Sequence, residues 1–415
     1  MAGFFMNFFP VRLDNLSEDC HIIRYNNKRM DGGVMVELDS LIKKYLPEVI
    51  RFRHELHKIP EIAGEEVKTS AAIREKLAAF PDLDVQAPYL KTDVVALMGD
   101  TALPNLTLRA DIDALPIEEK TGVDYSSTHN GFMHACGHDG HIAMLYGALL
   151  CLRELKNQLQ CSVRFLFQPG EEIRAMAKDL VHAGALKNPR ADFVAGIHGW
   201  PKGAFGTFST KSGAVMAAAG FFRIVIHGQG GHGSMPQKAK NPLETASKIV
   251  MASKQIIPYG CVLTICALNG GSNSNVIPEE AELLGTLRFL DPAAGEKMVS
   301  DFRQLCDRCC EEDGVRCDIE LDLPYPVTFN SERGYTFAKT CALKYIGENG
   351  FTEMLESSMG SEDFAFYLQK YDGVFCHLGL GSKTSNLHTE NFDFADDALE
   401  YGIRFFVGLA LEFRG

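Results

Sequence analysis

The chain has 415 residues, which is too long for one ordinary hydrophobic core, so about two domains are expected. Its apolar fraction of 46% and charged fraction of 23% are typical of a water-soluble globular protein. There are 54 Asp and Glu residues against 41 Lys and Arg, and the formal charge of −13 disfavours nucleic acid and anionic membranes as partners.

The twelve cysteines are scattered, and several lie inside apolar runs. They indicate reduced thiols in a cytoplasmic protein rather than a disulfide framework. No run of about 18 apolar residues exists, so no membrane span is predicted. Residues 1–34 show no clear periodicity. We expect them to form a poorly ordered N-terminal extension, or to reflect a start site placed too far upstream.

Residues 35–216 alternate helical and strand patterns, as in α/β proteins. Apolar residues at helical spacing predict helices over residues 38–57, 67–80 and 142–155. Short apolar runs predict strands over residues 94–98, 106–110, 163–167 and 193–197. Continuous apolar strands indicate a sheet covered on both sides, so we expect a mixed sheet between helices. Open α/β sheets bind ligands at the carboxyl ends of their strands.

The pattern changes between residues 217 and 326. Predicted elements follow the order β-α-β-β-α-β, with strands over 221–226, 261–268, 281–289 and 315–321, a helix beginning at Asn241-Pro242 and another over 295–312. This order is that of the ferredoxin-like unit, so residues 217–326 are expected to form an inserted domain. Residues 327–415 then complete the first domain, with helices over 332–346 and 398–413 and a strand over 374–378.

Acidic or imidazole side chains follow three strands of the first domain. Asp111 and Asp113 follow one, Glu171 and Glu172 follow another, and His198 follows a third. The segment His134-Ala-Cys-Gly-His-Asp-Gly-His141 adds a thiol and an imidazole, Cys136 and His138, just before a helix. Soft and borderline ligands beside hard ones indicate a transition-metal ion or a pair of them.

Each candidate also has an ordinary interpretation. A Cys-x-His pair alone is weak evidence, because most free cysteines are buried apolar fillers, but Glu172, His198 and His388 strengthen it. Glu171 is either a solvated loop carboxylate or a general base that takes a proton from an attacking water. Asp113 either caps a strand or hydrogen-bonds the far nitrogen of a ligating His. Three further histidines are expected to be structural: His57, His134 and His141.

Three residues of the inserted domain are candidates for substrate contact. His232 lies in Gly228-Gln-Gly-Gly-His-Gly-Ser234, whose glycines indicate close backbone approach or a mobile loop. It could reach across and stabilise an oxyanion. Arg288, at a strand end, could bind a carboxylate through two hydrogen bonds, although a surface ion pair is the commoner fate of an Arg. Asn275 is either a polar anchor or a turn residue.

A series of motifs, taken in order, is similar to that of a known enzyme family. They are His54-Glu-Leu-His57, Leu108-Arg-Ala-Asp-Ile-Asp-Ala-Leu-Pro116, His134 to His141, Phe167-Gln-Pro-Gly-Glu-Glu172, Gly230-Gly-His-Gly, Asn275-Val-Ile-Pro-Glu279, Gly285-Thr-Leu-Arg288, Gly360-Ser-Glu-Asp-Phe364 and Leu387-His388. From about Met35 to Phe413 the chain resembles the dinuclear-metal amidohydrolases. These include hippurate hydrolase, N-acyl-amino-acid amidohydrolases and plant auxin-conjugate hydrolases, which are relatives of aminoacylase.

The resemblance implies two divalent ions, manganese, zinc or cobalt, with Glu171 as catalytic acid and base. It implies that the inserted domain is a lid and a homodimer contact that carries His232 towards an active site. The implied reaction is hydrolysis of the amide bond of N-acyl amino acids, with an N-acetyl, N-benzoyl or similar acyl group. Two departures, Ile173-Arg-Ala-Met-Ala177 and Asn241 where many relatives have Asp, bear on substrate preference. The implied metal ligands are Cys136, His138, Glu172, His198 and His388.

Two other functions remain open. A dinuclear-metal dipeptidase or carboxypeptidase would use the same residues. A non-catalytic metal-binding or signalling protein on this fold is disfavoured, because every candidate ligand is present together with Glu171. The expected partner is a small N-acyl amino acid.

Overall fold

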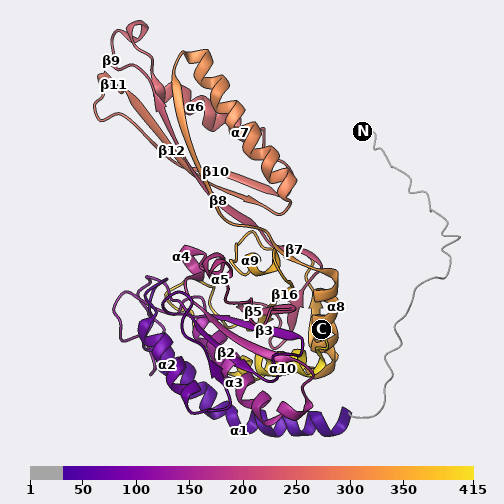
Figure 1. The fold of residues 1–415 in the computed structure, drawn as a ribbon. Coiled ribbons are helices and arrows are strands. Elements are labelled where there is room, and N and C mark those ends of the chain that lie inside the picture. The colour runs from indigo at the N-terminus through magenta and orange to yellow at the C-terminus, as the bar shows by residue number, and fades with distance from the viewer. Residues whose placement is uncertain (1–30) are drawn as a thin grey trace, which may run out of the picture.

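The computed structural model describes residues 31–415 and consists of two bodies joined by a narrow neck (Figure 1). The larger body contains an eight-stranded sheet with the order β1-β2-β4-β3-β5-β16-β6-β15. Its four central strands run parallel to one another, while β1, β2 and β6 pair with antiparallel neighbours. The predicted α/β fold with a mixed sheet between helices is therefore confirmed.

Nearly all residues of the central strands are buried, which accounts for the continuous apolar runs in the sequence. The central strands are β4 (Ser162–Gln168), β3 (Asn105–Asp111), β5 (Phe193–Trp200) and β16 (Asp372–Gly379). The outer strands are β1 (Asp84–Val85), β2 (Val94–Met98), β6 (Phe208–Thr210) and β15 (Phe351–Glu353).

Helices cover both faces of this sheet. Residues of α1 (Asp31–His57), α2 (Val67–Ala78), α3 (His138–Glu154), α8 (Glu332–Tyr345) and α10 (Leu399–Glu412) share the main core. The shorter α5 (Ala177–Ala183) and α9 (Ala365–Leu368) pack on the opposite face. Helix α3 is buried from His138 to Leu152 and most of these residues are apolar, so the core fixes the position of the candidate-ligand segment at its start.

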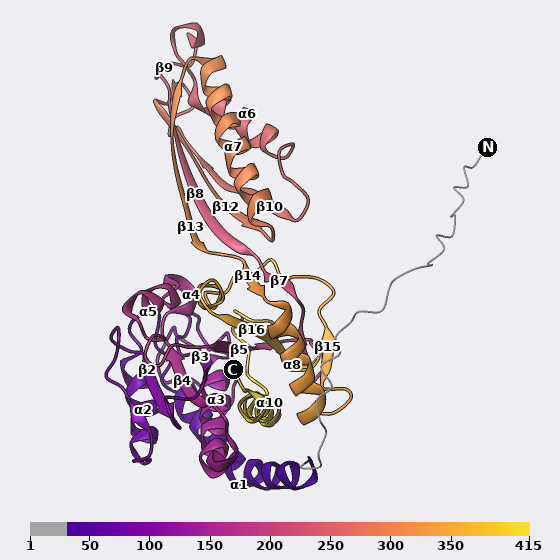
Figure 2. The same ribbon diagram turned by 45° about the vertical axis from the view of Figure 1, so that its right-hand side comes forward.

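The smaller body follows the predicted β-α-β-β-α-β order. Its elements are β8 (Ala218–His227), α6 (Pro242–Ser253), β10 (Cys261–Asn269), β12 (Glu280–Phe289), α7 (Pro292–Asp313) and β13 (Arg316–Tyr325). The strands form an antiparallel sheet in the order β10-β12-β8-β13, and both helices pack on one face, as Figure 2 shows. Because these elements have a core of their own, we propose residues 217–326 as the inserted domain and residues 35–216 with 327–415 as the catalytic one.

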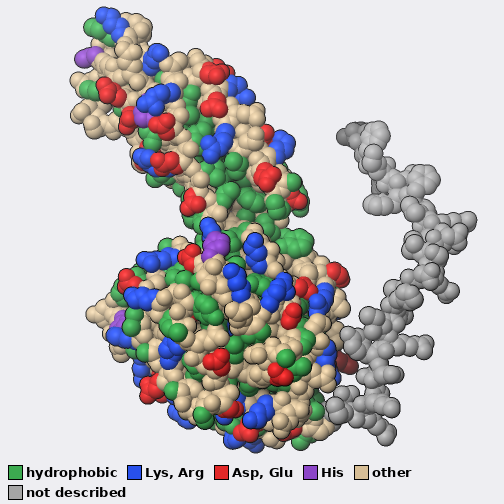
Figure 3. All heavy atoms as spheres, in the orientation of Figure 1, with side chains coloured by type: hydrophobic (Ala, Val, Ile, Leu, Met, Phe, Trp, Pro, Cys, Tyr) green, Lys and Arg blue, Asp and Glu red, His purple; other side chains and the backbone are tan. Residues whose placement is uncertain are grey.

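Short strands lie at the neck between the two bodies and at the outer tip of the smaller one. Strands β7 (Gly213–Met216) and β14 (Thr328–Asn330) pair at the neck, while β9 (Gly231–His232) and β11 (Val276–Ile277) pair at the outer tip. The 3-10 turns are η1 (Lys156–Gln158), η2 (Pro236–Lys238) and η3 (Asp396–Ala398). On the face that Figure 3 shows, acidic and basic side chains are interspersed over both bodies.

Several boundaries differ from those predicted. Helix α1 begins at Asp31, before the expected boundary at residue 35, and the rest of the predicted extension lies outside the described residues. Strand β5 continues beyond His198 to Trp200. Strands of two to four residues, such as β6 and β15, were not predicted because so few residues show no period.

Two expectations from the sequence, on membrane-spanning helices and on cysteines, can be compared with the structure of residues 31–415. None of the helices there has the length and apolar character needed to cross a bilayer. All the cysteines described there are unpaired thiols, and most of them are buried.

Candidate metal centre

The five side chains predicted to bind metal converge at the carboxyl ends of the central strands. Cys136 Sγ lies 3.3 Å from His198 Nε2 and 3.3 Å from His388 Nε2. Glu172 Oε2 is 3.3 Å from His388 Nε2, and Glu172 Oε1 is 3.7 Å from His138 Nε2. One thiol, three imidazoles and one carboxylate therefore form two overlapping groups, Cys136-His138-His198 and Cys136-Glu172-His388, whose donor atoms lie within 4.8 Å of one another.

A glycine at the start of α3 makes this convergence possible. Gly137 adopts a left-handed conformation with φ of 85°, which reverses the chain between Cys136 and His138. A Cβ atom at this position would lie 3.0 Å from the Phe394 ring and 3.2 Å from the Phe392 ring. Both the turn and the packing thus require glycine here.

His388 reaches the centre from a loop after β16. It is one of three residues other than glycine with positive φ in the described chain, at 59°. Its N–H donates a 2.8 Å hydrogen bond to the Ala135 carbonyl, next to Cys136. Left-handed backbone is uncommon for a residue with a side chain, so the surrounding contacts hold it there.

Asp113 lies where a supporting carboxylate is expected. His138 Nδ1 is 3.1 Å from Asp113 Oδ1 and 2.9 Å from the Asp113 carbonyl oxygen. The other carboxylate oxygen, Oδ2, accepts a 3.0 Å hydrogen bond from the Glu172 N–H. One residue therefore orients two of the candidate ligands, which is the usual task of a carboxylate behind a metal-binding His.

The chemistry of the pocket fits divalent cations. His138 Nε2 and Glu172 Oε1 are buried without a hydrogen-bond partner among residues 31–415, which is costly unless a cation binds them. Burial alone would lower the pKa of His138, but the charges of Asp111, Asp113 and Glu172 raise it to about 10. This excess of negative charge, with sulfur, nitrogen and oxygen donors, suits zinc or manganese.

Glu171 and Glu172 begin a short helix, α4 (Glu171–Arg174), directly after the strand that they were expected to follow. Gly170, with φ of 66°, bends the chain after β4, and successive side chains then point about 100° apart rather than in opposite directions. Atoms of Glu171, Glu172 and His138 lie within 4.8 Å of one another. Burial, together with the charges of Glu362 and Glu172, raises the pKa of Glu171 well above its usual value.

The histidines expected to be structural lie beside the centre. His141 Nδ1 is 2.5 Å from Asp111 Oδ1, and its Nε2 accepts a 2.8 Å hydrogen bond from the Gly199 N–H. His57 Nδ1 is 2.8 Å from Asp139 Oδ2. His134 is buried, and neither ring nitrogen has a hydrogen-bond partner within residues 31–415.

A buried arginine holds the acidic groups behind the centre, and sequence reasoning assigned it no role. Arg109 Nη1 lies 2.7 Å from Asp111, and Nη2 lies 3.0 Å from Glu362 and 2.9 Å from Asp363. Its Nε donates a 2.8 Å hydrogen bond to Gln168. The signal in the sequence is a charged residue inside the predicted apolar strand over residues 106–110, which the structure shows to be fully buried.

Tyr325 connects the inserted domain to Glu171. The hydroxyl of this last residue of β13 donates a 2.7 Å hydrogen bond to the Glu171 carbonyl oxygen. Tyr325 is buried with Ala175 and Ala219 in a small apolar cluster at the neck. Nothing in the local sequence indicated this contact.

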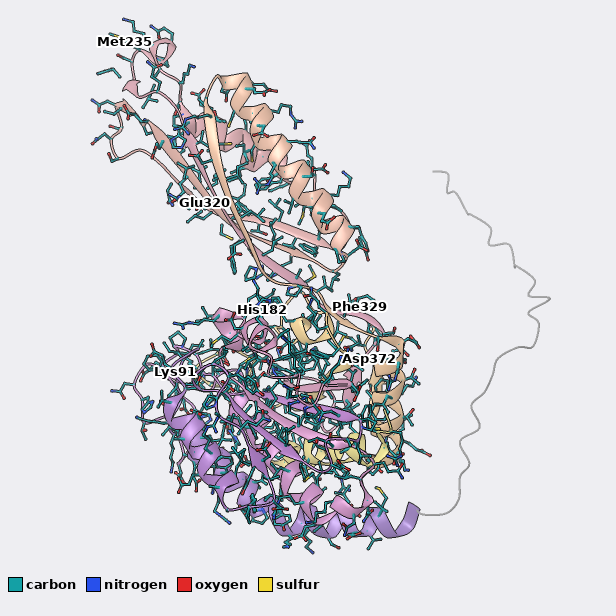
Figure 4. All side chains as sticks on the ribbon, viewed as in Figure 1. Lys91, His182, Met235, Glu320, Phe329 and Asp372 are labelled. Atoms are coloured by element: carbon teal, nitrogen blue, oxygen red, sulfur yellow. The ribbon has the colours of Figure 1, made fainter. Side chains whose placement is uncertain are left out.

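The three candidates of the inserted domain do not join the metal centre. His232 is exposed on β9 and pairs with Val276 beside Asn275, at the tip farthest from the catalytic sheet (Figure 1). Figure 4 shows this tip at Met235, whose N–H donates to the His232 carbonyl. His232 Nδ1 is 2.8 Å from the Ser234 hydroxyl.

Arg288 lies at the other end of the inserted domain, near the neck. It pairs with Ala219 at the start of β8, and its guanidinium lies over the Phe221 ring at 5.7 Å from the centroid. The group donates a 2.8 Å hydrogen bond to the Leu287 carbonyl. The same nitrogen, Nη1, also donates to the Gly220 carbonyl and the Thr286 hydroxyl, and no carboxylate among the described residues forms an ion pair with Arg288.

Metal removal gives a direct test of the centre. Adding Mn²⁺ or Zn²⁺ to chelator-treated protein should raise its melting temperature, because an ion that binds only the folded state stabilises it by about 2.7 kcal/mol at a hundred times its Kd. Cys136→Ala should reduce the metal measured by inductively coupled plasma mass spectrometry. Cys151→Ala, which removes a buried thiol of α3, should retain the metal. Equal metal content in both variants would exclude Cys136 as a ligand.

Comparison with known proteins agrees with the motifs. Residues 107–412 match peptidase family M20/M25/M40. The chain is 33% identical to N-acetylcysteine deacetylase of Bacillus subtilis over 89% of this chain and 97% of that one. It is 34% identical to the IAA-amino acid hydrolase ILR1-like 2 of Arabidopsis thaliana over 88% and 86% of the two chains.

A solved structure shows the same fold. The YXEP protein of Bacillus subtilis, a dinuclear metal binding peptidase from the M20 family, superimposes with a TM-score of 0.80 and 31% identity, over 89% of this chain and 98% of that one. The resemblance drawn from the motifs is thus confirmed. The chain belongs to peptidase family M20/M25/M40 and is a hydrolase of that family.

Proposed function

We propose that the protein hydrolyses the amide bond of N-acyl amino acids, releasing the amino acid and a carboxylic acid. The observation that carries this proposal is the convergence of Cys136, His138, Glu172, His198 and His388 beside the buried carboxyl of Glu171. Relatives named for deacetylation of N-acetylcysteine and for hydrolysis of IAA-amino acids support this substrate class.

In this proposal the five ligands hold two divalent ions, manganese, zinc or cobalt. Such ions lower the pKa of an attacking water and polarise the amide carbonyl. Glu171 takes a proton from the water and gives it to the departing amine, a role that its raised pKa suits. Asp113 orients His138, and Arg288 binds the carboxylate of the amino acid. Asn275 lies beside His232 at the opposite end of the inserted domain, so it assists Arg288 only if the lid moves or a second copy supplies it.

A substrate panel on manganese- and zinc-loaded protein tests the function. N-acetyl and N-benzoyl amino acids should be hydrolysed faster than unmodified dipeptides. Faster hydrolysis of the dipeptides would favour the alternative function, a dipeptidase or carboxypeptidase. The YXEP protein, which is described as a peptidase, is the reason to test this alternative. Bound metal with no turnover on the whole panel would instead favour a non-catalytic metal-binding role.

The inserted domain acts in this proposal as a lid and a homodimer contact. His232 lies at its outer tip, so it reaches a metal centre only if the lid moves or a second copy supplies it. His232→Ala should keep its metal and lose about a hundredfold in kcat, because one oxyanion donor is worth about that much. Steady-state kinetics measure this loss.

The matched control is His227→Ala, which replaces a histidine of the same domain whose ring nitrogens lie 2.8 Å from carboxylate oxygens of Glu280 and Asp318. It should leave kcat within a few-fold of the natural enzyme. Mixing the inactive His232→Ala and Glu171→Gln variants should restore activity only if a second copy supplies His232. Full activity of His232→Ala would remove this residue from the mechanism.

A further inference from the structure

A cavity of about 400 Å³ lies beside the metal centre, on the face of the sheet opposite α3. Trp200 at the end of β5, His377 on β16 and Ser209 on β6 form its floor. The segment after β15, including Met354 and Ser358, also lines it. Its volume falls within the range of small-molecule sites.

The floor of the cavity is a stacked aromatic pair. The rings of Trp200 and His377 lie 3.9 Å apart between centroids, with an angle of 2° between their planes. Aromatic surfaces of this kind bind flat apolar groups. The hydroxyls of Ser209 and Ser358 add polar groups around this surface.

His377 is an unusual residue for a buried strand. Its side chain is only 4% exposed, and its Nε2 has no hydrogen-bond partner among residues 31–415. No protein group among the described residues therefore satisfies this nitrogen, and an imidazole nitrogen can donate or accept a hydrogen bond according to its tautomer. A buried polar atom without a partner carries a desolvation penalty, which a ligand that hydrogen-bonds to it removes.

The cavity is within reach of the reacting bond. His377 pairs in register with the candidate ligand His198 on the neighbouring strand. The His198 ring lies 6.0 Å from the Trp200 ring, between centroids, while its Nε2 lies 3.3 Å from Cys136 Sγ. A substituent a few atoms from an amide held at the centre would therefore enter the cavity.

We propose that this cavity is a specificity subsite for a planar aromatic ring that carries a hydrogen-bonding group, with Trp200 contacting the ring and His377 Nε2 bonding the polar group. This inference rests on the proposed function. The ring belongs either to the acyl group or to the amino-acid side chain, since both lie close to the amide bond. In either case His377 determines which ring is preferred.

Two pairs of substrates distinguish these sources. For the acyl group, kcat/KM is compared between N-(4-hydroxybenzoyl)glycine and N-benzoylglycine. For the side chain, it is compared between N-acetyltyrosine and N-acetylphenylalanine. In one pair the hydroxylated substrate should be favoured about tenfold, the effect of one hydrogen bond of ordinary strength. His377→Phe, which keeps an aromatic ring in the stack, should reduce that preference to about one.

Ligand binding to the cavity can be measured without any turnover of substrate. Trp200 is the single tryptophan of the chain, so its fluorescence reports directly on this cavity. Titration with 4-hydroxybenzoate or tyrosine should change this fluorescence saturably, and the affinity should fall about tenfold in His377→Phe. This result would stand even if none of the substrates were hydrolysed, in which case only the proposed function would fail.

The inference is overturned by hydrolysis without a preference in either pair, together with Trp200 fluorescence that does not respond to the hydroxylated ligands. The same holds if His377→Phe keeps the full preference. Metal content should be equal in the variant and the natural protein, because His377 is not among the candidate ligands.

Discussion

Replacing Glu171 by Gln should lower kcat by a factor of about 10³ while leaving bound metal unchanged. General acid–base groups typically contribute 10²- to 10⁴-fold, and Glu171 is a buried carboxyl that lies beside the ligand cluster and is not itself a proposed ligand. The substitution should not harm folding, because Gln matches Glu in size and removes a negative charge from a buried acidic cluster that also holds Glu172 and Glu362. Single-turnover kinetics with metal analysis measure both effects.

The neighbouring residue supplies the control. Glu172→Gln should lose metal, because Glu172 Oε2 lies 3.3 Å from His388 Nε2 and its Oε1 faces His138. Comparing the two variants thus separates the loss of proton transfer from the loss of bound metal. Activity of Glu171→Gln within tenfold of the natural enzyme would exclude Glu171 as the base.

The catalytic sheet and the convergence of most candidate ligands at its edge could be predicted from sequence because the signals are local. Buried parallel strands appear as unbroken apolar runs, and the groups that follow them, Glu171 and His198, meet at one edge of the sheet. His388 lies in a loop, and the motif resemblance rather than any period identified it.

The residues behind the centre could not be predicted in the same way. Arg109 bonds acidic groups more than 250 positions away, and Tyr325 bonds the backbone carbonyl of Glu171 from another domain. These contacts depend on how the elements pack, and no local pattern encodes them. The position of His232 depends on the angle between two bodies, which a sequence does not show.

Replacing Arg109 by Met should be the most destabilising single change near the centre. Arg109 is 1% exposed and is the shared cation for Asp111, Glu362 and Asp363. Removing one partner of a buried ion pair costs about 3–5 kcal/mol, because it leaves buried charge without compensation. Trp200, which lies at the end of β5, reports unfolding of this sheet by fluorescence in a urea titration.

Arg164→Met is the matched control. Arg164 is also fully buried and lies on the adjacent strand β4, but it bonds neutral oxygens of Asn105, Thr107 and Pro189. Its removal leaves hydrogen-bonding groups unsatisfied but no unpaired charge, so it should cost about 1–3 kcal/mol. A smaller loss for Arg109→Met than for Arg164→Met would contradict the electrostatic account.

The cost of losing Arg109 should also depend on pH. Burial raises the pKa of Glu362 to about 8 and that of Asp363 to about 6, even with Arg109 present, and both values exceed those of unfolded chains. A carboxyl group whose pKa is higher in the folded than in the unfolded state favours folding while it is protonated. It loses its proton as pH rises through the folded pKa, and the buried negative charge then destabilises the fold. The deficit of Arg109→Met should therefore be smaller at pH 6 than at pH 9, and a deficit independent of pH would show that packing rather than charge holds this cluster together.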